Sequence, residues 1–284
     1  MKVAHHAEIA FEDWPGIRDA GALHRTLFQG DAGSPANFEF GIVEFSKERS
    51  GSPRHKHVFD QFRFALKGDI EYNPEQSIPE GCLAYFPEGT PYGPFRISAK
   101  SVLLSLQLGG PCGQGFVHRQ ELGAAQKALA AEGTFDKGIY TWLDKDGKKH
   151  NEDAHKAVWT RATGGADVTM PAPRYQDPLL IFPQNYMWRA IGPLVEEKLL
   201  GVFNERNTSA KMLRIKKSGS YLRKRETQMN LYFVVDGAMS VNSAVNGAEI
   251  CQKHDACRFD PADEARLEAM ADTTLLVYGL PQFS

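Results

Sequence analysis

Residues 51–68 read GSPRHKHVFDQFRFALKG, and residues 81–94 read GCLAYFPEGTPYGP. The first stretch places His55 and His57 one residue apart, so both imidazoles point to the same side of an extended strand. Neutral imidazole is a common ligand of zinc, iron, copper and nickel. The pair therefore predicts a metal site or a polar ligand pocket within β structure, and the remaining ligands must be sought nearby.

The glycine and proline spacing of these stretches resembles the cupins, whose motifs read roughly Gly, His-x-His, Glu, Gly and then Gly-x5-Pro-x-Gly-x2-His. The matching positions here are Gly51, His55, His57, Gln61 and Gly68, followed by Gly81, Pro87, Gly89 and Tyr92. The resemblance covers about a sixth of the chain. It implies an all-β fold of double-stranded β-helix (jelly-roll) barrels with a metal pocket at the two histidines.

Two positions depart from the cupin pattern, because Gln61 stands in the slot of the glutamate and Tyr92 in the slot of the last histidine. A glutamine offers a neutral carbonyl oxygen, and a phenol binds a metal well only after losing a proton whose ordinary pKa is about 10. We expect His55, His57, Gln61 and Tyr92 to hold a divalent or ferric ion. Iron is our first choice, with manganese, nickel, copper and zinc as alternatives. The competing interpretation is a ligand cavity without metal.

The strand after the histidines has a two-residue period that sorts its side chains. Gln61, Arg63 and Ala65 share one face, and Phe62, Phe64 and Leu66 share the other. If Gln61 faces the metal, Arg63 does too, and its guanidinium could hold a carboxylate substrate. Alternatively, Arg63 pairs with Glu39, Glu44 or Asp60 and ties strands together.

The segment 85–94 contains three prolines and two glycines between aromatic rings. Such a constrained loop would hold Tyr92 in place as a metal ligand, a general acid or base, or a hydrogen-bond donor to substrate. Tyr92 and Arg63 are therefore the candidate catalytic residues. The alternative for Tyr92 is an ordinary packed aromatic in a tight turn.

Short apolar segments broken by Gly, Pro, Asn and Asp are typical of antiparallel β structure. The clearest expected strands are residues 38–45, 61–66, 81–86, 101–108, 211–216, 229–235 and 274–278. One surface helix is expected over 119–132, where strong helix formers end at Gly133. Residues 144–154 are charged and predict an exposed turn and loop, so we expect the nearby His150 and His155 to face solvent.

The stretch 230–237 repeats the spacing of 61–68, because a polar residue begins a strand that ends seven residues later at a glycine. This duplication predicts two cupin-like domains, residues 1–165 with the metal pocket and residues 166–284 as a degenerate copy. In that copy Lys224 and Glu226 replace the histidines, and an echo of the second motif leads to Arg266. Its expected role is structural, with an anion site using Arg223, Lys224 or Arg225 as the alternative.

Charge and cysteine content exclude several classes of protein. The chain of 284 residues carries 33 basic and 35 acidic side chains, so nothing favours nucleic acid or an anionic membrane. The basic cluster 214–225 is interpreted as a solvated strand edge or loop. Four cysteines without C-x-x-C pairing read as reduced thiols, and no signal or transmembrane stretch is evident. We therefore expect a soluble cytoplasmic protein.

Three function classes remain open. The first is a metal-dependent enzyme acting on a small oxygen-bearing metabolite, with dioxygenase-like oxidation preferred over isomerisation or elimination. The second is a small-molecule-binding bicupin without turnover, and the third is a structural or storage bicupin. A homodimer is expected through exposed sheet edges, exchanged N-terminal strands or the extended segment 171–183, which could instead simply connect the barrels.

Overall fold

The two predicted motifs lie in the first of two β-barrels. The computed structural model describes residues 1–14, 22–45, 49–52, 54–165, 168–243 and 247–283. Within these ranges the first barrel joins a seven-stranded and a four-stranded antiparallel sheet. The larger sheet runs β15 (Leu179–Ile181), β9 (Leu83–Phe86), β6 (Phe59–Lys67), β11 (Val102–Gly109), β4 (Phe38–Phe45), β3 (Ala22–Gln29) and β2 (Glu12–Trp14). The smaller sheet runs β5 (Arg49–Ser52), β10 (Phe95–Ile97), β7 (Ile70–Asn73) and β8 (Gln76–Ile78).

The second barrel repeats this plan among the described residues. Its seven-stranded sheet runs β1 (Lys2–Ala4), β23 (Ala256–Phe259), β20 (Asn230–Asp236), β25 (Thr273–Gly279), β18 (Ser209–Ile215), β17 (Val195–Val202) and β16 (Arg189–Gly192). Its four-stranded sheet runs β19 (Ser220–Arg223), β24 (Ala265–Ala269), β21 (Ala238–Ser243) and β22 (Gly247–Gln252). The all-β, jelly-roll, two-barrel prediction is confirmed.

The internal repeat has a structural counterpart, because β6 and β20 occupy the same place in the two sheet orders. Gly68 and Gly237 follow these strands with φ of 69° and 91°, which are left-handed values that favour glycine. At Gly237 a Cβ would also lie 2.3 Å from the carbonyl oxygen of Asp272. The repeated spacing thus marks the same turn in both barrels.

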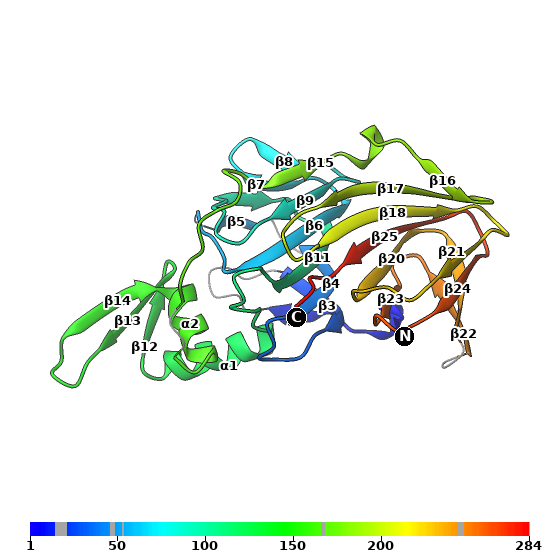
Figure 1. Ribbon diagram of the computed structural model, residues 1–284. Coiled ribbons are helices and arrows are strands. Elements are labelled where there is room, and N and C mark those ends of the chain that lie inside the picture. Colours follow the sequence, from blue (N-terminus) through cyan, green and yellow to red (C-terminus); the bar gives the residue numbers. More distant parts are fainter. Residues whose placement is uncertain (15–21, 46–48, 53, 166–167, 244–246, 284) are drawn as a thin grey trace.

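The large sheets of the two barrels pack against each other, as Figure 1 shows. Phe62 lies 5.3 Å from Tyr278 between ring centroids, and Phe40 lies 6.3 Å from Phe233. The phenylalanine face of β6 therefore covers the second barrel, while its opposite face, with Ala65, belongs to the interior core of the first. The alternation predicted for this strand is confirmed.

A helical insertion extends from the first barrel between β11 and the second half of the chain (Figure 1). It comprises α1 (Arg119–Ala130), the three-stranded sheet β12 (Gly133–Asp136), β13 (Ile139–Leu143) and β14 (Lys149–Asp153), and α2 (Ala154–Ala162). The helix expected over 119–132 is confirmed as α1. The loop expected over 144–154 is wrong in part, because β14 pairs with β13 and Asp153 caps α2 by accepting the N–H of Lys156.

Each large sheet includes a strand from the far side of the predicted domain boundary. β1 pairs with β23 in the second barrel, and β15 pairs with β9 in the first. Residues 166–167, where the boundary was predicted, lie outside the described residues. The division at 165 stays a prediction, and a cut there would separate one strand from each sheet.

No described helix is long and apolar enough to cross a membrane. The four cysteines are free. Cys251 and Cys257 lie with their Sγ atoms 3.4 Å apart in the core of the second barrel. Two short 3₁₀ turns, η1 (His6–Glu8) and η2 (Pro183–Asn185), complete the described secondary structure.

Candidate functional site

Backbone pairing brings the two motifs together at the entrance of the first barrel. His55 and Tyr92 form an isolated antiparallel bridge in which each N–H donates to the other's carbonyl oxygen at 2.9 Å. The N–H of Gly89 donates to the carbonyl of His57 at 2.8 Å. The constrained loop predicted over 85–94 is thus tied directly to the segment that carries the histidines.

The phenol oxygen of Tyr92 is the meeting point of the predicted site residues. Nε2 of His57 lies 2.9 Å from it, and Nη2 of Arg63 donates to it at 3.1 Å. The Tyr92 hydroxyl lies 3.3 Å from Oε1 of Gln61, to which it can donate its proton. Because a phenol has one proton, His57 is the donor to Tyr92 whenever Gln61 is the acceptor, and the roles follow the imidazole tautomer.

Burial sharpens this cluster, since Tyr92 is 1% exposed, Gln61 3% and Arg63 9%. The guanidinium of Arg63 lies over the ring of Phe86 at 4.7 Å and over the ring of Tyr92 at 5.1 Å. Such cation–π contacts hold a buried guanidinium in a fixed position. The sequence correctly placed Gln61 and Arg63 on the interior face.

Two of the carboxylates considered as alternative partners of Arg63, Glu39 and Asp60, have contacts of their own. Glu39, which lies on β4 beyond the neighbouring strand β11, contacts Arg119. Asp60 accepts hydrogen bonds on the opposite side of β6. The guanidinium of Arg63 lies beside the Tyr92 oxygen, where it can stabilise negative charge.

His55 and His57 stand at the edge of this cluster, and both are partly exposed. Their ring centroids are 4.9 Å apart, and the His55 ring lies 4.5 Å from that of Tyr92. The structure therefore brings together all five residues that the sequence proposed: His55, His57, Gln61, Arg63 and Tyr92. Which of them hold a ligand stays a prediction.

The donor atoms can be tested against the metal that the cupin resemblance implies. Atoms bound about 2.1 Å from one ion at right angles to each other are roughly 3 Å apart. The 2.9 Å and 3.3 Å spacings around the Tyr92 oxygen match this value. Within the described ranges, no group of three His, Cys, Asp or Glu side chains is arranged to hold an ion. The same spacings are those of hydrogen bonds, so imidazole, phenol and amide oxygen stay the predicted donor set.

A pocket of about 330 Å³ opens beside the histidines. Its walls come from residues 54–58 of the first barrel, from the insertion, and from Val168 and Met170. The insertion contributes His155, whose ring lies 5.5 Å from that of His57. The prediction that His155 faces solvent is wrong, because α2 turns it toward the first barrel.

His155 was missed because its neighbourhood is charged and lacks an apolar run. The usable signal lies further along, where Ala157, Val158 and Trp159 form the buried face of α2. His150, by contrast, is half-buried and pairs with Asp144 at 2.7 Å on the hairpin. Only one of the two histidines therefore belongs to the pocket.

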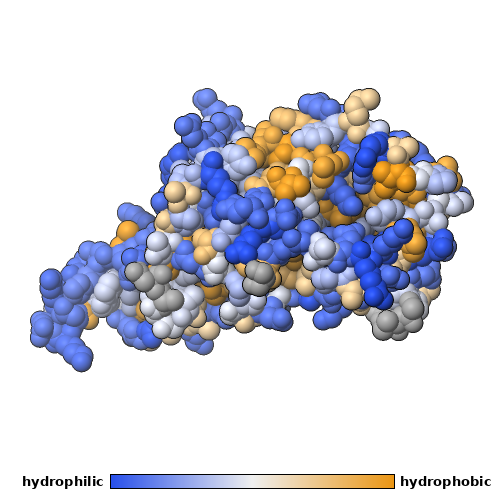
Figure 2. Space-filling model, in the orientation of Figure 1, coloured by the Kyte–Doolittle hydropathy of each residue, from blue (hydrophilic) through white to orange (hydrophobic). Residues whose placement is uncertain are grey.

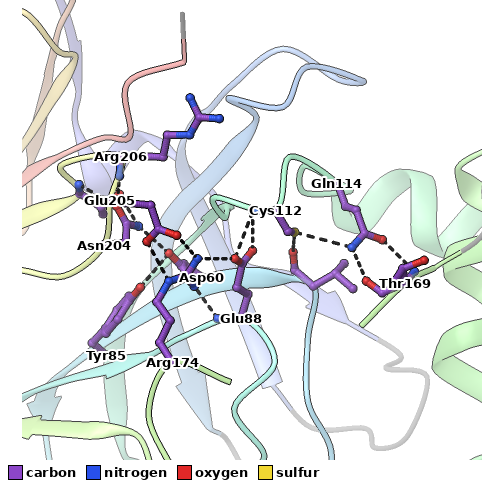
Figure 3. Close-up of polar contacts among 12 residues, drawn as sticks. Asp60, Tyr85, Glu88, Cys112, Gln114, Thr169, Arg174, Asn204, Glu205 and Arg206 are labelled. Atoms are coloured by element: carbon purple, nitrogen blue, oxygen red, sulfur yellow. Dashed lines mark hydrogen bonds and ion pairs between the residues drawn. The ribbon is translucent and has the colours of Figure 1, made fainter. Parts of the chain in front are cut away.

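A second polar network lies behind the site and was not predicted (Figure 3). The fully buried Asp60 accepts hydrogen bonds from the Tyr85 hydroxyl at 2.8 Å, the Glu88 N–H at 2.8 Å and Nδ2 of Asn204 at 2.7 Å. Burial raises the pKa of Asp60 to about 6, against the lowering effect of these donors. The carboxylate joins the start of β6, the loop of Tyr92 and the second barrel.

Arg174 completes this network by crossing from the connecting segment to both barrels. Its guanidinium donates to Glu88 at 2.8 Å and to both carboxylate oxygens of Glu205, each at 2.8 Å. Gly89 packs so closely on the same segment that a Cβ would lie 2.3 Å from the carbonyl oxygen of Pro171. The segment predicted either to connect the barrels or to serve a dimer thus fastens the loop of Tyr92.

Glu88 also links the network to the insertion side. Its carboxylate accepts the N–H of Cys112 at 3.1 and 3.2 Å. The Cys112 thiol donates to the carbonyl of Val58 at 3.2 Å, and Gln114 accepts the N–H of Thr169 at 3.1 Å (Figure 3). The feature of the sequence that could have indicated this network is a glutamate, Glu88, between the motif residues Pro87 and Gly89.

The equivalent place in the second barrel has different chemistry. Arg223 is fully buried over the ring of Phe259, and its Nη2 donates to Asn230 at 3.0 Å. Lys224 and Arg225 point outward, and Arg225 pairs with Glu264 at 3.2 Å. The fully buried Arg223 shows that the interpretation of cluster 214–225 as solvated is wrong at this residue. The alternative of an anion site that uses Arg223, Lys224 or Arg225 stays a prediction.

The alignment of the second motif shifts by one residue. Gly81 donates its N–H to Ala65, and His254 donates to Val234, which holds the same place in β20. His254 has a φ of 75°, matching the 78° of Gly81. The counterpart of Gly81 is therefore His254, and the same count of eleven residues puts Ala265, not the predicted Arg266, at the position of Tyr92.

Neither a protein-family model nor a curated protein sequence matches the chain. Solved structures match it over its length. A candidate dioxygenase from Nostoc punctiforme has a TM-score of 0.62 at 12% identity, covering 100% of this chain and 83% of that one. Streptomyces albus HEPD, with 2-hydroxyethylphosphonate and Fe(II) bound, gives 0.57 at 13%, covering 97% and 74%. Lactobacillus farciminis oxalate decarboxylase, in a formate complex, gives 0.57 at 11%, covering 100% and 88%.

These neighbours are cupin-fold proteins, and several are bicupins. This chain has the bicupin fold. At 11–13% identity the likeness concerns the fold. The chemistry of this bicupin must be argued from its own residues.

Proposed function

We propose that this bicupin is a metal-dependent enzyme that acts on a small carboxylate metabolite in its first barrel. The observation that carries the proposal is the convergence of His57, Gln61 and Arg63 on the Tyr92 oxygen, beside a pocket of about 330 Å³. Donor atoms for an ion and a cation for an anionic substrate lie within one cluster. The Fe(II) and 2-hydroxyethylphosphonate in HEPD support an assignment to a small oxygen-bearing substrate.

The proposed ligands of the ion are His55, His57, Gln61 and Tyr92, and iron is the proposed metal ahead of manganese, nickel, copper and zinc. Imidazole is a good ligand for iron, nickel, copper and zinc and a less suitable one for manganese. A phenol oxygen suits a hard, highly charged ion such as ferric iron. When bound, the ion would supply a Lewis-acid or redox centre for the substrate. Dioxygenase-like oxidation is our first choice of reaction, and metal-dependent isomerisation or elimination the second.

The chain's own residues would position substrate and protons. Arg63 stabilises negative charge at the Tyr92 oxygen or on a carboxylate brought beside it, since it donates there at 3.1 Å. Tyr92 and His57 share a hydrogen bond of 2.9 Å, so a proton can pass between phenol and imidazole. Tyr92 is buried on its side of this exchange, and His57 lines the pocket.

The decisive experiment is the metal content of the purified, tag-free protein, measured by inductively coupled plasma mass spectrometry. We expect near-stoichiometric metal in the wild type and its loss in a His55→Ala/His57→Ala variant. His150→Ala is the matched control, because this histidine pairs with Asp144 outside the pocket. Absence of metal after anaerobic reconstitution would contradict the proposal.

A binding protein without turnover is the second candidate, and one observation favours it. The Tyr92 oxygen already has hydrogen-bonding contacts with His57, Gln61 and Arg63, which form a complete polar cluster of protein atoms. Such a cluster could fix an organic acid without an ion. A metal-free protein that still binds a carboxylate would select this alternative.

We also propose a homodimer, supported by an apolar surface along the edge of the second barrel. Figure 2 shows apolar residues gathered over β16, β17 and the turn before them. The exposed apolar side chains in this region are Phe182, Tyr186, Met187, Ile191, Leu194, Leu199 and Val202. A light-scattering mass equal to the 31.6 kDa of one chain would contradict the dimer.

A further inference from the structure

The lining of the pocket beside the histidines combines two chemically different kinds of side chain. Apolar groups of Val58, Trp159, Val168 and Met170 form one part of the lining. The other part carries the cationic side chains of Arg54, Lys56 and Lys156 against the single carboxylate of Asp153. Nothing in the sequence motifs indicated this composition, because four of the eleven lining residues, Asp153, His155, Lys156 and Trp159, come from the insertion.

The insertion is anchored firmly enough to define the wall. Trp159 is 3% exposed and stacks on Phe59, with centroids 5.7 Å apart and planes 13° apart. Phe59 in turn lies 4.4 Å from His57, and His155 stacks on Trp159 at 5.8 Å. A continuous set of aromatic rings therefore fixes α2 relative to the candidate metal ligands.

The charged side chains that line the pocket favour an anionic ligand. Asp153 caps α2 through its Oδ1, which accepts the Lys156 N–H at 2.9 Å, so its carboxylate serves the helix end. Three permanent cations then exceed one carboxylate, and an anion entering the pocket is attracted. The volume, near the lower end of the roughly 300–1,000 Å³ of ligand sites, suits a small molecule.

We propose that the substrate or ligand is a carboxylate with an apolar body of about one ring, and that Lys156 of α2 is a specificity-determining residue. The body packs on Trp159 and Met170, and the carboxylate is held by the cationic part of the pocket. This inference rests on the location of the proposed function and narrows its substrate class. It assigns the insertion a role in ligand choice.

The test uses the full chain and isothermal titration with three probes: benzoate, its uncharged analogue benzamide, and acetate, which lacks the body. We expect benzoate to bind best, and Lys156→Glu to weaken benzoate on the order of ten-fold, as for loss of a hydrogen bond to a charged group. Lys149→Glu is the matched control, since Lys149 is exposed on β14 of the same insertion and does not line the pocket.

A second variant tests the apolar part. Met170→Ala should weaken benzoate but leave acetate unchanged, because acetate has no body to pack there. Failure of benzoate to bind, equal binding of benzamide, or an unchanged affinity in Lys156→Glu would each overturn the inference.

Metal content separates this inference from the proposed function. Lys156→Glu should keep the metal content of the wild type, because Lys156 is not a proposed ligand. Metal-free protein whose benzoate binding still depends on Lys156 would support this inference while removing the metal-dependent enzyme. Metal-loaded protein that binds benzoate equally well with and without the Lys156→Glu substitution would support the metal-dependent enzyme and contradict this inference.

Discussion

The two barrels share a strand order and even a buried arginine, yet only one has a candidate site. Arg63 lies 4.7 Å over Phe86 in the first barrel, and Arg223 lies 5.3 Å over Phe259 in the second. The first guanidinium donates to the hydroxyl of Tyr92, whereas the second donates to Asn230. The same type of residue therefore faces a reactive oxygen in one copy and completes the core in the other.

This difference shows which features the duplicated fold requires. Strand pairing, turn glycines and an aromatic partner for the guanidinium occur in both barrels. The histidine pair and the tyrosine occur only in the first, and in the second Arg223 pairs with Ala265 as His55 pairs with Tyr92. Chemistry thus depends on a few side chains that the barrel does not need for folding.

The largest expected effect tests the structural arginine. Arg223→Ala removes a fully buried side chain, leaves a cavity and deprives the Asn230 and Asp263 oxygens of their donor. We expect the free energy of unfolding to fall by about 3–5 kcal/mol, as for other large buried truncations. Urea denaturation measures this loss.

Arg225→Ala is its control, because the exposed pair of Arg225 with Glu264 should contribute little to stability. Metal content and benzoate binding per folded molecule should be unchanged in Arg223→Ala. A loss of either at full stability would mean that the second barrel takes part in the chemistry, contrary to the comparison.

The next effect concerns the buried carboxylate of Asp60 in the first barrel, whose position in the second barrel holds an apolar residue. Asp60 precedes Gln61, and the matching residue before Asn230 is Met229. Burial raises the pKa of Asp60 from 3.8 to about 6, so the folded protein holds this proton more tightly than the unfolded chain. Its contribution to stability is present below about pH 4 and is lost as the pH rises through 6.

We therefore expect the stability difference between wild type and Asp60→Asn to shift against the wild type between pH 4 and pH 7, on the order of 3 kcal/mol. Denaturation at several pH values measures it. Met229→Leu is the control, since neither side chain titrates and its effect should be independent of pH. If the difference in the free energy of unfolding between wild type and Asp60→Asn did not change with pH, burial would not destabilise the charged carboxylate, contrary to the prediction.

Sequence reasoning succeeded where one local pattern determines the outcome. Phe38–Phe45 alternates and forms β4, and residues 119–130 are helix formers and form α1. The five proposed site residues meet because alternation and two motif loops suffice to place them. These features depend on neighbours in sequence.

What was missed depends on distant parts of the chain. His155 reaches His57 only because Trp159 stacks on Phe59, a contact between residues 100 positions apart. Arg174 meets Glu88 and Glu205 because the connecting segment runs between the barrels. Charged side chains in a turn-rich stretch carry no periodic signal of such contacts, so the sequence favoured a solvated loop.

The last prediction tests the oxygen that distinguishes the barrels. Tyr92→Phe keeps the ring packed against His55 and Phe86 but removes the atom on which His57, Gln61 and Arg63 converge. If Tyr92 is a ligand, metal affinity should fall by at least about 10- to 100-fold, the loss typical of removing even a supporting contact around an ion. A competitive chelator titration measures it, and reconstitution with ferric iron should give a visible phenolate-to-iron absorption band in the wild type alone.

Tyr175→Phe is the matched control, because Tyr175 is 37% exposed and its backbone carbonyl, which accepts the Thr90 hydroxyl, is kept in the variant. Equal affinity and an unchanged band in Tyr92→Phe would make this oxygen a substrate or proton contact rather than a ligand. The phenol would then resemble Asn230 of the second barrel, a hydrogen-bonding partner that fixes a buried guanidinium. In that case the two barrels would differ in what their buried arginine binds. Arg63 would bind an anionic ligand, whereas Arg223 binds Asn230 of the protein itself.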